Sequence, residues 1–156
     1  MDRARRLANH IKRTMRGPMW HGPALRQVLD GVTHDQAAAR PVRGAHSIWE
    51  LVLHVTAWVD IARARLAGDR VADPPLEADW PPVAATSAEA WQAAVDRLAE
   101  SHRQLADAVR ELSDEALDAK VATLDYSVDV MLHGIVEHGT YHGGQIMLLR
   151  RALEQD

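Results

Sequence analysis

Three of the nine histidines in this 156-residue sequence lie on helix faces that should be buried. His138 and His142 are one helical turn apart, so their side chains project from the same face of the predicted last helix. His54 shares the apolar face of another predicted helix with Leu51 and Trp58. We therefore predict that three imidazoles from two helices converge inside a helical bundle.

A divalent metal ion is one way to satisfy three buried imidazoles, because each neutral ring offers a nitrogen lone pair. Three protein ligands leave coordination positions open to water or substrate, which is typical of catalytic rather than structural sites. Zinc is the default for all-imidazole ligation, and nickel, iron or manganese are also compatible. The alternative is three core histidines that are hydrogen-bonded to the backbone or to each other.

Three further polar residues are candidates to support the imidazoles. Gln145 lies on the same face as the histidine pair and can bond a ligand ring or a bound water. Glu50, one turn before His54, can orient that ring, although a helix-capping role explains it equally well. His102 lies on the apolar seam of a third helix. It can be an extra ligand, a group that supports the ligands, or a packed polar residue. No catalytic base is evident, and Tyr141 is expected to pack away from the metal face.

Glycine and tryptophan positions give two further expectations. Gly139, Gly143 and Gly144 lower helix propensity, which makes sense if another helix or a ligand approaches closely there. The sequence lacks Phe, so tryptophan must supply most of the aromatic bulk. Any of the five tryptophans can wall the site. Trp58 and Trp91 are interpreted first as core residues, which leaves Trp20, Trp49 and Trp80 as wall candidates.

The elements that position these residues are predicted to be four long amphipathic helices. No strand pattern competes with them, so we expect an all-α four-helix bundle. Capping signals are expected at Ser47–Glu50, Thr86–Glu89 and Ser127. The predicted helices cover residues 2–16 (resuming from about 23 to 29), 47–68, 87–112 and 128–153.

The connection between the second and third helices is long and rich in proline. Residues 69–85 contain Pro74, Pro75, Pro81 and Pro82, so we expect no helix there. Such a connection can return along the whole bundle, which predicts that the two helices are parallel. It can also cover a site. A shorter linker is expected at 113–118.

Length and composition restrict the function further. The chain suits a single domain over residues 1–156, and without Cys it can form neither a disulfide nor a thiolate site. The net charge of -4 disfavours nucleic acid as a partner. No apolar run is long enough to span a membrane and no secretory signal is evident, so we expect a cytoplasmic protein.

Three segments resemble the DinB-like (DinB/YfiT) metal-binding helical-bundle family. Leu132–Ile146 resembles the signature of its last helix, and Ser47–His54 is similar to the segment with its first histidine. Trp20–Leu25 is similar to a first-helix motif of one branch. The three matches occur in the expected order along most of the chain.

The resemblance implies an up-down-down-up bundle and a metal, commonly zinc or nickel, held by His54, His138 and His142. Members include thiol S-transferases, a thiol-dependent isomerase and metal-dependent hydrolases, and members often form homodimers. We thus expect a metal-dependent enzyme that activates water or a low-molecular-weight thiol co-substrate toward a small-molecule substrate. The alternatives are a metal- or ligand-binding stress protein without turnover and a helical interaction module.

Overall fold

The structure is a computed structural model that describes residues 2–70, 73–122 and 124–154. The all-α prediction is confirmed, since the described residues form eight helices and no strand. The helices are α1 (Arg3–Arg16), α2 (Leu25–Leu29), α3 (His34–Ala38), α4 (Ile48–Leu66), α5 (Leu76–Asp79), α6 (Ala88–Arg110), α7 (Asp114–Asp118) and α8 (Val128–Leu153).

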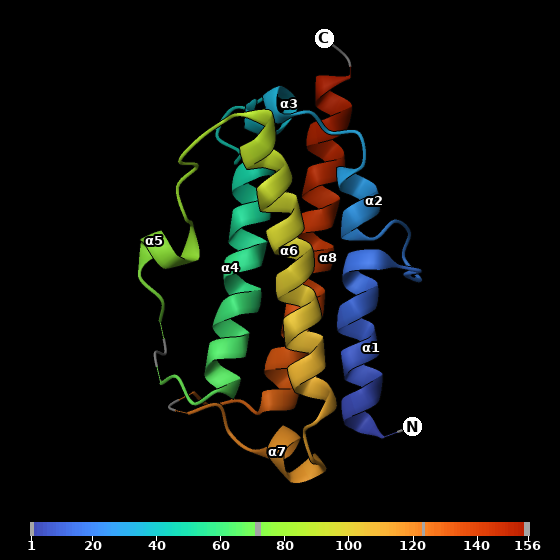
Figure 1. Cartoon of the computed structure of the whole chain (residues 1–156), viewed down its shortest axis with the longest axis vertical. Coiled ribbons are helices and arrows are strands. Elements are labelled where there is room, and N and C mark those ends of the chain that lie inside the picture. Colours follow the sequence, from blue (N-terminus) through green and yellow to red (C-terminus); the bar gives the residue numbers. More distant parts are fainter. Residues whose placement is uncertain (1, 71–72, 123, 155–156) are drawn as a thin grey trace.

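Four long helices, α1, α4, α6 and α8, lie side by side, and α2 continues the direction of α1 (Figure 1). Figure 1 shows α1 and α8 running upward and α4 and α6 running downward. The indole rings of Trp49 and Trp91, near the first residues of α4 and α6, have centroids 5.2 Å apart, as parallel neighbours require. α8 runs in the opposite direction to its neighbour α4, so this pair is antiparallel (Figure 1).

Polar residues at the predicted positions begin the long helices. The Ser47 hydroxyl accepts a hydrogen bond from the Glu50 N–H, and the Glu50 carboxylate accepts one from the Ser47 N–H, which completes a capping box. Ser127 caps α8 in the simpler way, through the Val130 N–H. At α6 the cap is Ser87 rather than the predicted Thr86, because the Ser87 hydroxyl accepts from the Ala90 N–H.

The bundle core is built from the apolar stripes of the long helices. The seam predicted on α6 buries Leu98, Leu105 and Val109 almost completely. One half of the core surrounds Ile11 and Leu132, and the other half surrounds Ile48. None of the described helices is both long enough and apolar enough to cross a membrane.

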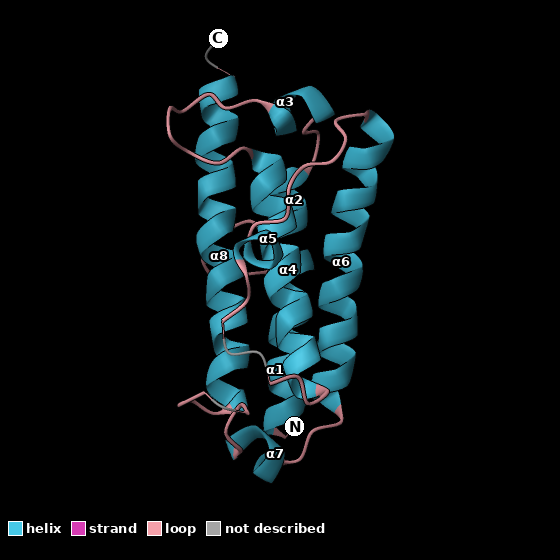
Figure 2. Ribbon diagram, turned by 90° about the vertical axis from the view of Figure 1, so that its left-hand side faces the viewer, coloured by secondary structure: helices cyan, strands magenta, loops and turns pink. Residues whose placement is uncertain are grey.

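Two connections contain helical turns that were not expected from the sequence. α5 fits between prolines, because Pro75 is its N-cap and the next proline, Pro81, follows its end. α7 begins after Ser113, whose hydroxyl accepts from the Ala116 N–H. Figure 2 shows α5 lying over α4, beside α8, so the crossover covers one face of the bundle.

Candidate metal centre

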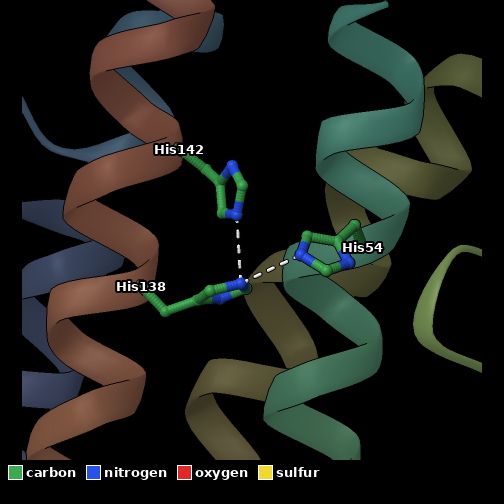
Figure 3. Close-up of side chains that lie close together, drawn as sticks. All are labelled: His54, His138 and His142. Carbon is green, nitrogen blue, oxygen red and sulfur yellow. Dashed lines mark hydrogen bonds between the residues drawn. The ribbon is translucent and has the colours of Figure 1, made fainter. Parts of the chain in front are cut away.

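The imidazoles of His54, His138 and His142 meet between α4 and α8 (Figure 3). His138 Nε2 lies 3.0 Å from Nε2 of His54 and 3.0 Å from Nε2 of His142. One nitrogen from each ring lies within 4.8 Å of the others. A tetrahedral ion with Zn–N bonds of 2.0–2.1 Å places its ligand nitrogens about 3.3 Å apart. The two separations of 3.0 Å at His138 are close to this value.

The hydrogen bonds of the outer ring nitrogens make the cluster suited to a cation. His54 Nδ1 lies 2.7 Å from the Asp79 carbonyl oxygen, which can only accept, so Nδ1 carries the hydrogen. His142 Nδ1 likewise donates to Gln145 Oε1 at 2.6 Å. In the neutral rings, the Nε2 atoms of His54 and His142 are then both lone-pair acceptors. Three facing nitrogens share at most one hydrogen, and a metal ion satisfies all three lone pairs.

Burial keeps these imidazoles neutral. Desolvation, helped by the neighbouring His142 and His54, lowers the pKa of His138 to about 3. Desolvation also lowers the pKa of His54, against the opposing effect of Asp79. The pKa of His142 is lowered mainly by desolvation, and the bond to Gln145 opposes this. At neutral pH the rings therefore present lone pairs rather than charges, as metal ligation requires.

Asp79, at the end of α5, supports His54 and was missed by the sequence reasoning. Besides the carbonyl bond, its carboxylate Oδ1 lies 3.2 Å from His54 Nδ1 and accepts a hydrogen bond from Trp58 Nε1 at 2.7 Å. An acidic partner on the outer nitrogen of a ligating histidine fixes the ring and raises its basicity. The one feature of the sequence that could have indicated this support is the adjacent acidic and aromatic pair Asp79–Trp80 within the proline-rich crossover.

Trp80 follows Asp79 and covers the face of His54. Its ring is parallel to the His54 ring within 4°, with centroids 3.7 Å apart. The His46 ring stacks on Trp80 as well, at 3.7 Å and 11°. The exposed His46 is therefore the outer ring of a three-ring stack that covers one side of the cluster.

The three predicted supporting residues have different environments. Gln145 bonds His142 directly, as described above. Glu50 instead directs its carboxylate to the Ser47 N–H and to the Arg40 guanidinium, so its observed bonds serve the helix cap and an ion pair. His102 is buried on α6, where its Nδ1 donates to the Leu98 carbonyl at 2.9 Å, and it does not line the cavity at the imidazoles.

The expectations for the tryptophans and for Tyr141 had mixed outcomes. Trp80 walls the cavity, and so does Trp58, whereas Trp49 is buried in the core and Trp20 is fully exposed on a loop away from that cavity. Tyr141 does not pack inside; it is largely exposed and lines the cavity mouth.

The three glycines differ in their surroundings. A Cβ atom at Gly139 would lie 2.9 Å from Thr14 Cγ2, which confirms a close helix approach. A Cβ atom at Gly143 would make an ordinary contact of 3.5 Å with Leu25 Cδ2. At Gly144 a Cβ atom would meet nothing within 4 Å, so the expected close approach is absent there.

A cavity of about 590 Å³ extends from the imidazoles along the groove between α4 and α8. This volume is in the range that holds small-molecule ligands. Its lining is mostly apolar, with polar groups at the two ends. His54, His138 and His142 all line it, so a ligand in the cavity can reach the imidazole cluster.

These features define a class of protein: a four-helix bundle with a three-histidine cluster between two antiparallel helices, open to a cavity. The sequence model of the DinB superfamily matches residues 20–146, and the chain belongs to this superfamily. The resemblance found in the sequence is thereby confirmed. Neither a curated protein nor a solved structure shows a match to the chain.

Proposed function

We propose that His54, His138 and His142 hold one divalent metal ion, zinc or nickel, that serves a reaction on a small molecule. The observation that carries this proposal is the convergence of three Nε2 lone pairs with too few hydrogens to satisfy them. The family match supports it. The alternative of structural core histidines leaves two acceptor nitrogens, of His54 and His142, facing a His138 nitrogen that has at most one hydrogen to share.

The opening of the cluster into a ligand-sized cavity supports a catalytic rather than a structural ion. Such an ion would supply Lewis-acid chemistry and lower the pKa of a water or thiol ligand toward neutrality. Because the chain contains no Cys, a thiol would enter as a low-molecular-weight co-substrate. The proposed activity is thus thiol S-transfer or hydrolysis.

The protein's own side chains have positioning roles in this proposal. Asp79 and Gln145 hold the His54 and His142 rings with Nε2 directed to the centre. Trp80 and Trp58 exclude water from one side and provide an apolar surface for substrate. Tyr141, at the mouth, is placed to contact a bound molecule.

The first test is the metal content of protein purified without chelator, measured by mass spectrometry. About one zinc or nickel per chain, or uptake of one on titration, is expected. Protein that contains no metal and gains no thermal stability from either ion would refute the proposal and favour an interaction module.

The second test is turnover. Metal-loaded protein is incubated with cysteine or glutathione plus an aryl halide, and separately with activated esters, and product is followed by absorbance. Metal-dependent turnover of one pair is expected. Silence across a broad panel with full metal occupancy would favour the metal- or ligand-binding stress protein over the enzyme.

A further inference from the structure

A buried arginine lies at the end of the cavity opposite the imidazoles. Arg65 is in the last turn of α4 and lines the cavity together with Tyr126, which precedes α8. Arg65 Nη1 donates a hydrogen bond to the Tyr126 hydroxyl at 3.1 Å. The guanidinium carbon lies 5.7 Å from the centroid of the Trp58 ring, which holds the cation over an aromatic face.

Arg65 and the imidazoles face the same space. His54, Trp58 and Arg65 lie on one face of α4, and eleven residues of helix place the Cα atoms of His54 and Arg65 about 16 Å apart. Helix side chains lean toward the N-terminus, which brings the guanidinium back toward the cluster. The Trp58 ring lies 6.0 Å from the His138 ring, so the indole contacts the cation on one side and approaches the His138 imidazole on the other.

The wall between the two ends is apolar. It is formed by the side chains of Trp58, Ala62, Val130, Met131 and Ile135. Among the described residues that line the cavity, the one acidic side chain is Asp79, which lies at the imidazole end beside His54. The lining therefore places a positive charge at one end, an apolar channel in the middle and neutral imidazoles at the other end.

We propose that Arg65 and Tyr126 bind the carboxylate of an elongated monocarboxylic acid whose apolar body lies along Trp58. A guanidinium matches a carboxylate in shape and charge, and the bond is strengthened where water is excluded. The Tyr126 hydroxyl, which accepts from Arg65, can donate its own hydrogen to the second carboxylate oxygen. The far end of such a ligand would reach the imidazoles.

This inference rests on the proposed function only where it places the far end of the ligand at the metal centre. It assigns the substrate class as a carboxylic acid with a medium-length alkyl or aryl body. The carboxylate site itself requires no metal, so its test can be separated from the test of the metal centre.

The test is calorimetric titration of metal-free protein, in EDTA, with sodium octanoate and with octanamide. The two probes share length and apolar chain and differ in charge. Octanoate is expected to bind at least about tenfold more tightly than octanamide, as a charge-assisted contact predicts. Equal affinities, or binding of neither probe, would overturn the inference.

Variants locate the effect. Arg65→Met keeps an unbranched apolar stem without the guanidinium and should remove the preference for octanoate. Arg63→Met is the matched control on the same helix. Arg63 pairs with Asp60 and does not line the cavity, so its variant should bind like the wild type. An Arg65→Met protein that stays folded by circular dichroism and keeps the preference would refute the assignment.

A second variant covers the case in which Arg65→Met does not fold. Tyr126→Phe keeps the ring and the charge of Arg65 but removes the hydroxyl, and it should weaken octanoate binding several-fold with octanamide unchanged. In the wild-type protein, zinc uptake without any preference for octanoate over octanamide would overturn this inference alone. Absence of zinc uptake with octanoate binding intact would overturn the metal proposal alone.

Discussion

Replacing His138 with alanine should abolish the stabilisation of the bundle by zinc. His138 is the ring shared by the other two, since its Nε2 lies 3.0 Å from both neighbouring Nε2 atoms. In His138→Ala, His54 and His142 remain as ligands, but the central nitrogen is lost. The helical content should not change, because α8 keeps its cap and its other core residues, and alanine is a strong helix former.

The size of the effect follows from linkage. Zinc at a concentration a hundredfold above its Kd stabilises the folded protein by about 2.7 kcal/mol. For a chain of this size, that raises the melting temperature by about 5–10 °C. Losing a ligand should weaken binding at least about a hundredfold, since loss of an outer partner alone costs 10–100-fold. The same zinc concentration then contributes only about 0.4 kcal/mol, a rise below about 2 °C.

The assay is thermal unfolding by circular dichroism, with and without one fixed zinc concentration. His133→Ala is the matched control, because His133 lies on the same helix but is exposed and faces Asp129 at 3.8 Å. The control should keep the full zinc-induced rise. If His138→Ala shows the same rise as the wild type, the three imidazoles do not share an ion and the reasoning fails.

Three other perturbations test the surroundings of the site. Asp79→Asn removes the charge beside the His54 ring and should weaken zinc binding, measured by calorimetry, about 10–100-fold. A change of less than about threefold would contradict the role of Asp79 in positioning His54. Gly139→Ala forces a Cβ atom to 2.9 Å from Thr14 Cγ2 and should lower the free energy of unfolding in urea by about 1–3 kcal/mol. Gly144→Ala, in open space, should raise it by up to about 1 kcal/mol. Equal stabilities of the two variants would refute the packing argument. Burial lowers the pKa of His102 from its ordinary value of 6.5, so as the pH falls His102 is protonated in the unfolded chain before it is protonated in the folded one. The metal-free protein therefore loses stability as the pH falls below about 6.5. His102→Leu should make that loss shallower between pH 7.5 and 5, and an unchanged pH dependence of the urea midpoint would show that His102 does not contribute.

The sequence predicted the local structure well because its signals are local. α8 begins and ends where the Ser127 cap and the apolar periodicity predict, and the Ser47–Glu50 capping box begins α4. The shared face of His138 and His142 also follows from helix geometry alone. The third imidazole could be expected on the same interior because it lies on another apolar stripe.

The support of the site could not be predicted in the same way. Asp79 and Trp80 reach His54 from a crossover without periodicity, across 25 residues of chain, and no local pattern specifies where such a segment lies. Glu50 was a candidate because it is close to His54 in sequence, but its carboxylate points to Arg40 instead. Proximity along the chain did not identify the partners.

The sequence by itself determined which segments are helices, which faces are apolar and which histidines those faces carry, because hydrogen bonding, capping and periodic burial act over a few residues. Only the tertiary structure decided which faces meet, that three lone pairs point to one centre, and that Arg65 and the imidazoles share a cavity. Those outcomes depend on the packing of α4 against α8 and on the path of the crossover. Both are set by the simultaneous fit of many side chains that lie far apart in the sequence.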